Sequence, residues 1–162
     1  MSDPKPDVAP ERVFLVVVDD TPEVTQALHW AGLRAAHTGG RIALLHVVEP
    51  VENQQWMAVE ELMRAERRAE AEAVLSKRGA EALDWSGRQP ILFIREGNVR
   101  DELLALIEQE AAISVLVLGA GTGKEGPGPL VSHLAGKMSG RLRIPIVLVP
   151  GILSDEQLRM IA

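Results

Sequence analysis

The chain contains no cysteine among its 162 residues, which excludes disulfide bonds, thiolate metal ligands and thiol redox chemistry. Aromatic residues are also scarce, at 3%, so we expect an aliphatic core. No apolar run approaches the roughly 18 residues that a transmembrane helix needs, and we expect no membrane partner. The segment before residue 11 lacks the basic and apolar regions of a secretory signal, so a cytoplasmic location is the expectation.

The charge balance is acidic, with 17 Lys and Arg residues against 23 Asp and Glu residues and a formal net charge of -6. Such a chain repels nucleic-acid phosphates and anionic lipid, so we expect no nucleic-acid partner. Its apolar content of 46% and charged content of 25% are typical of a globular protein that forms one domain. We expect a flexible tail over residues 1–11, a single domain over 12–150 and a C-terminal tail over 151–162.

Continuous apolar runs alternate with amphipathic helical stretches along the chain. This alternation is typical of a parallel sheet that is covered by helices on both faces, in an open, doubly wound α/β fold. We expect five strands, over residues 13–18, 41–48, 90–94, 114–118 and 144–149. The helices between them are expected to begin after a Thr21 cap, near residue 54, after an Asn98 cap and after the loop at 119–129. A short helix from Ser154 follows the last strand.

An acidic pair, Asp19 and Asp20, follows the first strand directly. Ligands bind at the carboxyl ends of the strands in a doubly wound sheet, so one carboxylate could hold a ribose hydroxyl or a metal ion. A pair of solvated turn aspartates is an equally good interpretation from position alone. The pair also suits a two-component receiver domain, but the third strand ends at Arg95-Glu96 instead of an aspartate, and Ile144 stands where a receiver has lysine before Pro145. The receiver interpretation is therefore the weaker one.

A glycine-rich loop over residues 119–129 follows the fourth strand and precedes a helix, an arrangement that presents backbone N–H groups to an anion. The segment is too short for a Walker A loop, and Glu125 stands where that motif needs Ser or Thr. The spacing Gly121-x-Gly123-x-x-Gly126 matches the dinucleotide fingerprint, but it follows the fourth strand instead of the first. Neither motif explains the loop.

The sequence resembles the universal stress protein family over about residues 12–150. The resemblance rests on five segments in order: residues 16–23 with Ala27-Leu28, residues 44–48, Glu96-Gly97-Asn98, residues 115–119 and residues 145–149. It implies a Rossmann-like, adenine nucleotide alpha hydrolase-like sheet with strand order 3-2-1-4-5. It also implies a homodimer through the last strand, from Ile144 to Val149, which would otherwise be an exposed apolar edge.

The glycine motif of the family's nucleotide-binding branch is degenerate in this chain. In that branch a glycine closes the fourth strand, a second follows after two residues, and a third follows after nine more, with Ser or Thr next. Counted from Gly119, these positions hold Thr122, Ser132 and His133, so the spacing is kept and the residues differ. A second register restores all three glycines but begins the last helix too close to Pro145, and we prefer the first.

The resemblance implies a nucleotide site at the carboxyl ends of strands 1 and 4, in which Asp19 binds the ribose while Val47 and Leu118 flank the adenine. The phosphates would lie near residues of the glycine loop and the helix after it: Gly119, Gly121, Thr122, Ser132, His133 and Leu134. Lys124 could neutralise phosphate, whereas Pro127 and Pro129 have no N–H to donate. Whether ATP or AMP binds therefore stays open, and Mg²⁺ is expected only alongside ATP.

The sequence places no nucleophile beside a base and an orienting acid, and no pair of histidines has metal-ligand spacing, so we predict neither a catalytic centre nor a metal site. His46 is expected to be a hydrogen-bonded structural residue, and His29 and His37 to lie on helix surfaces. The first hypothesis is a non-catalytic stress-response protein that binds an adenine nucleotide and reports it through a dimer. The alternatives are a nucleotide-free homodimeric interaction scaffold and a slow ATPase.

Overall fold

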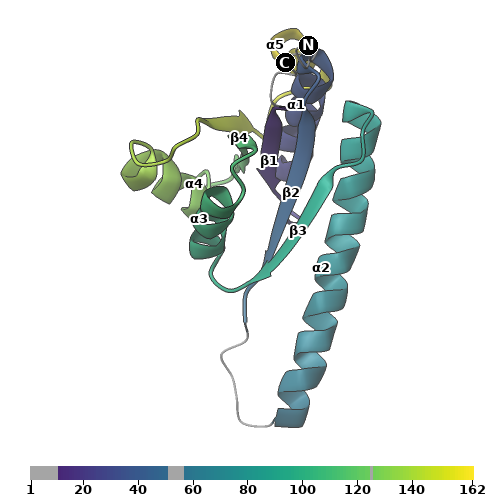
Figure 1. Cartoon of the computed structure of the whole chain (residues 1–162), viewed down its shortest axis with the longest axis vertical. Coiled ribbons are helices and arrows are strands. Elements are labelled where there is room, and N and C mark those ends of the chain that lie inside the picture. The colour runs from purple at the N-terminus through teal and green to yellow at the C-terminus, as the bar shows by residue number, and fades with distance from the viewer. Residues whose placement is uncertain (1–10, 51–56, 125) are drawn as a thin grey trace, which may run out of the picture.

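Five parallel strands form one sheet in the order β3-β2-β1-β4-β5, in a computed structural model that describes residues 11–50, 57–124 and 126–162 (Figure 1). The strands are β1 (Val13–Val17), β2 (Arg41–Val48), β3 (Ile91–Glu96), β4 (Ile113–Ala120) and β5 (Ile146–Pro150). The predicted α/β class and strand order are therefore confirmed. Nearly all of the expected N-terminal tail lies outside the described residues.

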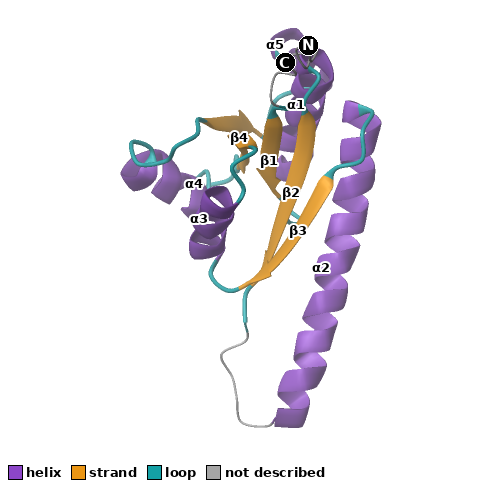
Figure 2. Cartoon of the chain, viewed as in Figure 1, coloured by secondary structure: helices purple, strands orange, loops and turns teal. Residues whose placement is uncertain are grey.

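Helices cover both faces of this sheet, as the alternating pattern predicts (Figure 2). They are α1 (Glu23–Thr38), α2 (Met57–Ser86), α3 (Val99–Gln109), α4 (Pro129–His133), a π-helical turn η1 that continues α4 (Leu134–Met138), and α5 (Asp155–Ile161). Helices α1, α2 and α5 pack on one face, and α3, α4 and η1 pack on the other.

The central strand β1 is apolar at every position because it is buried on both faces. Phe14 and Val16 point into the core on the α1 side, while Val13 and Leu15 point into the core on the α3 side, and all four are at most 4% exposed. An uninterrupted aliphatic run is what a strand between two helical layers requires. The aliphatic core predicted from the scarcity of aromatics is confirmed.

Of three helix starts that the sequence predicted, two have the expected side-chain cap and one does not. The Asn98 side chain accepts hydrogen bonds from the backbone N–H groups of Arg100 at 3.0 Å and Asp101 at 3.3 Å, which confirms the predicted cap. Ser154 caps α5 in a reciprocal capping box with Gln157. Thr21, in contrast, makes no cap for α1, because its hydroxyl donates to the carboxylate of Asp19 instead.

The C-terminal helix α5 packs on α1 and covers a histidine that we expected at the surface. Leu158 of α5 is fully buried in the core cluster of β1 and α1. His29 of α1 is only 4% exposed, stacks on Trp85 at 4.6 Å and has its Nδ1 3.3 Å from the Asp155 carboxylate. The surface prediction for His29 is wrong because the helical period of α1 does not reveal that another helix lies over this side.

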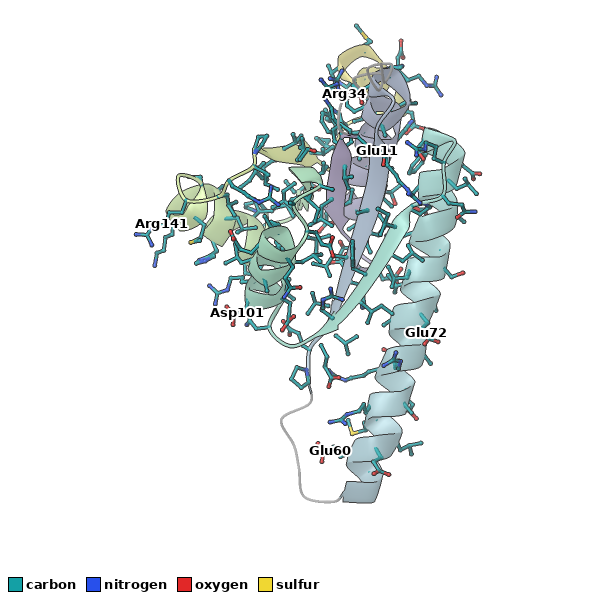
Figure 3. All side chains as sticks on the ribbon, in the orientation of Figure 1. Glu11, Arg34, Glu60, Glu72, Asp101 and Arg141 are labelled. Carbon is teal, nitrogen blue, oxygen red and sulfur yellow. The ribbon has the colours of Figure 1, made fainter. Side chains whose placement is uncertain are left out.

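The long helix α2 runs beside β3 and continues past the carboxyl ends of the strands (Figure 1). The labelled Glu72 points into solvent on the side of the helix away from the sheet, whereas the Glu60 side chain is only 29% exposed and lies 3.9 Å from Arg64 (Figure 3). Arg68 lies 3.6 Å from Glu72 one turn on, and both side chains are more than half exposed. This side of the helix is therefore a solvated charged face.

Candidate functional site

A cavity of about 1060 Å³ lies at the carboxyl ends of β1, β2 and β4. Strand order reverses between β1 and β4, since β2 and β3 lie on one side of β1 while β4 and β5 lie on the other. Such a reversal separates the loops that leave neighbouring strands and opens a crevice there. The walls come from the β1–α1 connection, the end of β2, the start of α3 and the loop that follows β4.

The predicted site residues divide into those that line this cavity and those that do not. The cavity-lining group consists of Asp19, Val47, Leu118, Gly119, Gly121 and Thr122. Ser132, His133 and Leu134 are outside the lining, because α4 begins at Pro129 and all three lie in or beyond its second half. The N–H of Ser132 donates to the carbonyl of Gly128 at 3.0 Å, and that of Leu134 donates to carbonyls within α4.

Asp19 lines the cavity, whereas its neighbour Asp20 does not. The Oδ1 atom of Asp19 accepts hydrogen bonds from the backbone N–H of Thr21 at 2.8 Å and from the Thr21 hydroxyl. Asp20 lies 3.4 Å from the ammonium of Lys77 on α2. The two carboxylates that were equivalent by sequence position therefore have different surroundings, and only Asp19 faces the cavity.

Two aliphatic side chains, Val47 of β2 and Leu118 of β4, line the cavity from strands on either side of β1. Leu118 is only 2% exposed and belongs to the core cluster on the α3 face, and the partly buried Val47 packs against that cluster. They provide an apolar surface next to the carboxylate of Asp19. Such a combination suits a ligand with a flat apolar ring and adjoining hydroxyl groups.

Gly119 follows Leu118, the last buried residue of β4, and lies against the first turn of α1. A Cβ atom at this position would lie 2.7 Å from the carbonyl oxygen of Glu23 and 2.8 Å from its carbonyl carbon. Both atoms belong to the backbone, so they cannot move aside as a flexible side chain would. Gly119 therefore lets β4 and α1 approach each other, whatever ligand the cavity binds.

The loop after β4 is held by its own hydrogen bonds. The N–H of Gly121 donates to the carbonyl of Pro127 at 3.3 Å, and that of Gly126 donates to Gly123 at 3.1 Å. Gly126 and Gly128 have φ values of +80° and +105°, which favour glycine. Two N–H groups that could have faced an anion are thus used inside the loop.

Besides Asp19, charged groups of both signs line the cavity, and of these the sequence analysis considered only Lys124 as a ligand contact. Lys124 and Arg100 supply positive charge, while Glu23 and Glu49 supply negative charge. Arg100 also contacts His133, with 3.3 Å between its Nη1 and the imidazole Nδ1. The Asn98 cap was the available signal for Arg100, because it places the start of α3 at the carboxyl edge of the sheet.

His46 also lines the cavity, and its Nδ1 lies 2.8 Å from the carbonyl oxygen of Val18. The predicted hydrogen bond of His46 is confirmed. Within the described part of the chain, no group of three or more His, Asp or Glu side chains is arranged to hold a metal ion. No helix in that same part is long and apolar enough to cross a membrane.

The sequence matches the model of the universal stress protein family over residues 11–150. Among solved structures, universal stress protein UspA from Lactobacillus plantarum is 18% identical, with 88% of this chain and 99% of that chain covered and a TM-score of 0.68. A universal stress protein from Archaeoglobus fulgidus in complex with dAMP is 16% identical, with 87% and 99% covered and a TM-score of 0.59.

A universal stress protein family protein from Arabidopsis thaliana with AMP bound is 18% identical, with 91% of this chain and 95% of that chain covered and a TM-score of 0.58. No curated protein sequence gives a match. At these identities the solved structures support the fold, and the family model, which covers most of the chain, supports the family. The chain belongs to the universal stress protein family.

Proposed function

We propose that this protein is a non-catalytic regulatory protein that binds an adenine nucleotide, AMP or ATP, in the cavity at the carboxyl ends of β1 and β4. The observation that carries the proposal is that Asp19, Val47 and Leu118 line one cavity. A carboxylate can accept hydrogen bonds from ribose hydroxyls, and aliphatic side chains can pack on a purine ring. Structural relatives solved with AMP and dAMP support the same ligand class.

The cavity volume of about 1060 Å³ is ample for a nucleotide, since small-molecule sites usually span roughly 300–1,000 Å³. We assign the phosphate end to the loop after β4, where Gly119, Gly121 and Thr122 line the cavity together with Lys124. Contacts from Ser132, His133 and Leu134 stay predictions, because these three residues do not line the cavity. Mg²⁺ would accompany ATP and not AMP.

Calorimetric titration with AMP and ATP at millimolar concentration tests the proposal. Asp19→Ala should weaken AMP binding by about tenfold or more, because it removes a charged hydrogen-bond acceptor. The matched control is Asp20→Ala, the adjacent carboxylate that points away from the cavity, and it should bind AMP as the unchanged protein does. No heat with either nucleotide would end the proposal, and equal binding by both variants would end the assignment of Asp19.

A second candidate, a nucleotide-free interaction scaffold, is favoured by the loop after β4. Pro127 and Pro129 lack N–H groups, and the N–H of Gly121 is used by the carbonyl of Pro127. A loop whose N–H groups donate to its own carbonyls has fewer donors left for phosphate. This candidate predicts that the purified protein releases no nucleotide on heating. ATP turnover that disappears in Lys124→Ala would instead indicate the slow ATPase.

Both candidates include a homodimer through β5, the edge strand of the sheet. Its backbone groups on the outer side face away from β4, and Leu148 is 40% exposed. An apolar edge strand invites a second strand to pair with it. Light scattering should give about twice the chain mass of 17.6 kDa, and Leu148→Lys should lower that mass toward the monomer value. A monomer mass for the unchanged protein at micromolar concentration would refute the dimer.

A further inference from the structure

The buried guanidinium of Arg78 contacts the connection between β1 and α1. It reaches this connection from α2, which packs on the same face of the sheet as α1. Arg78 lies in the second half of α2 and is only 2% exposed. No other Arg, Lys, Asp or Glu in the described residues is comparably buried. A buried charge of this kind is costly unless every donor has a partner.

The partners of Arg78 are mostly backbone atoms of that connection. Its Nε donates to the carbonyl of Asp19 at 3.1 Å, and its Nη2 donates to the carbonyl of Thr21 at 2.9 Å. Its Nη1 donates to the hydroxyl of Thr25 at 2.9 Å and lies 3.0 Å from the Glu81 carboxylate. All three nitrogens are thus engaged, and the rigid guanidinium plane fixes two carbonyls that lie two residues apart.

These contacts hold the stretch of backbone that carries the Asp19 carboxylate. The main-chain carbonyl of Asp19 is held by Arg78, while its side-chain Oδ1 accepts from the N–H of Thr21 at 2.8 Å. The carbonyl of the preceding Val18 is held by His46. Both ends of the short turn are therefore anchored, at the carbonyls of Val18 and Thr21.

We infer that Arg78 is a positioning residue for the cavity: it binds no ligand itself, since it does not line the cavity, but orients the Asp19 carboxylate that does. The inference rests on the proposed nucleotide site for its effect on binding. Its structural part, the orientation of Asp19 by Arg78, holds or fails without any ligand.

The first test is a binding cycle with AMP as the probe, comparing the unchanged protein, Arg78→Lys, Asp19→Ala and the double variant. Lysine keeps the positive charge but loses the planar fork. Arg78→Lys should weaken AMP binding about tenfold when Asp19 is present and by less than about twofold when it is absent. Equal weakening in both backgrounds, or none in the first, would overturn the inference. Arg68→Lys, on the exposed face of the same helix, is the control and should bind AMP normally.

The second test needs no ligand and uses amide hydrogen exchange. The N–H of Thr21 donates to the Asp19 side chain, and the N–H of Arg100 donates to the Asn98 side chain in a local geometry of the same kind, at 2.8 Å and 3.0 Å. Arg78→Lys should speed exchange at Thr21 about tenfold and leave Arg100 unchanged. Unchanged exchange at Thr21, or equal acceleration at both amides, would refute positioning.

The two tests separate the two ideas. If AMP does not bind even the unchanged protein while Thr21 responds selectively, the proposed function fails and the positioning role stands. Should Arg78→Lys prove too unstable to purify, Arg78→Gln allows the same two measurements, because its amide can still donate to one of the two carbonyls.

Discussion

The contact between Gly119 and the first turn of α1 gives the sharpest prediction for stability. In Gly119→Ala the new methyl group would lie 2.7 Å from the Glu23 carbonyl oxygen and 2.8 Å from the carbonyl carbon, well inside normal van der Waals separation. The end of β4 and the start of α1 must then move apart by several tenths of an ångström. Overpacking of this kind usually costs about 1–3 kcal/mol.

In a protein of this length, that loss corresponds to a fall in melting temperature of about 2–12 °C. Thermal unfolding of the ligand-free protein measures it directly. Gly123→Ala is the matched control, because Gly123 lies in the neighbouring loop, has no described atom within 4 Å of the added Cβ, and does not have a positive φ. Its melting temperature should change little or rise slightly, since alanine restricts the unfolded chain.

Equal melting temperatures for the two variants would refute the packing role of Gly119. A variant with unchanged stability and weakened AMP binding would instead assign Gly119 to ligand contact, as its place in the family motif suggests. The experiment therefore separates two reasons for a glycine at position 119. One is close packing against the backbone of α1, and the other is contact with the ligand.

Two further predictions concern the cavity rim and the C-terminal helix. Glu23→Gln removes a carboxylate from the cavity wall beside Gly119 and Gly121. It should raise the affinity for ATP relative to AMP by roughly threefold to tenfold, because less negative charge then faces the phosphates; an unchanged ratio in calorimetry would mean that the phosphates lie elsewhere. Ser154→Ala removes the capping box of α5 and should loosen the helix by about 1 kcal/mol, seen as about fivefold faster exchange at the Leu158 amide. Exchange at the unchanged rate would show that packing alone holds the helix.

The sheet was predictable because its signals are local. Apolar runs give the strands, and the Asn98 cap fixes the start of α3 to the residue. The resemblance to a family added the strand order, which periodicity alone does not contain. The five strands were placed to within about two residues at each end, which is the scatter that frayed ends produce.

The site was only partly predictable, because it depends on contacts between distant segments. Asp19 and Asp20 are neighbours of the same type, and the fold alone turns Asp19 toward the cavity and Asp20 toward Lys77 of α2. His29 follows the surface pattern of α1 until α5 covers it. Arg78 shares the buried face of α2 with Leu75 and Ala82 by helical spacing, but that spacing does not show which carbonyls its guanidinium would meet there.

Helix α4 begins earlier than the family spacing implies, and here the reason is a local sequence signal instead of a distant contact. The family spacing counted from Gly119 puts its Ser or Thr position at His133, preceded by Ser132, but Gly128-Pro129 upstream provides a residue with positive φ followed by proline, a strong local signal for a helix start. The local signal sets the observed boundary. The family spacing alone could not show that the Gly-Pro signal would decide where the helix begins.

Helix α5 has a practical consequence for how this protein can be cut and joined. The family match ends at residue 150, yet Leu158 fills a place in the same core as Val16 and Val149. A fragment that stops at the family boundary would leave an open hydrophobic slot beside α1, with the burial of one leucine, worth about 1.5–3 kcal/mol, lost. The core extends beyond the residues that the family model matches, and a fusion or tandem repeat of this domain should therefore retain α5.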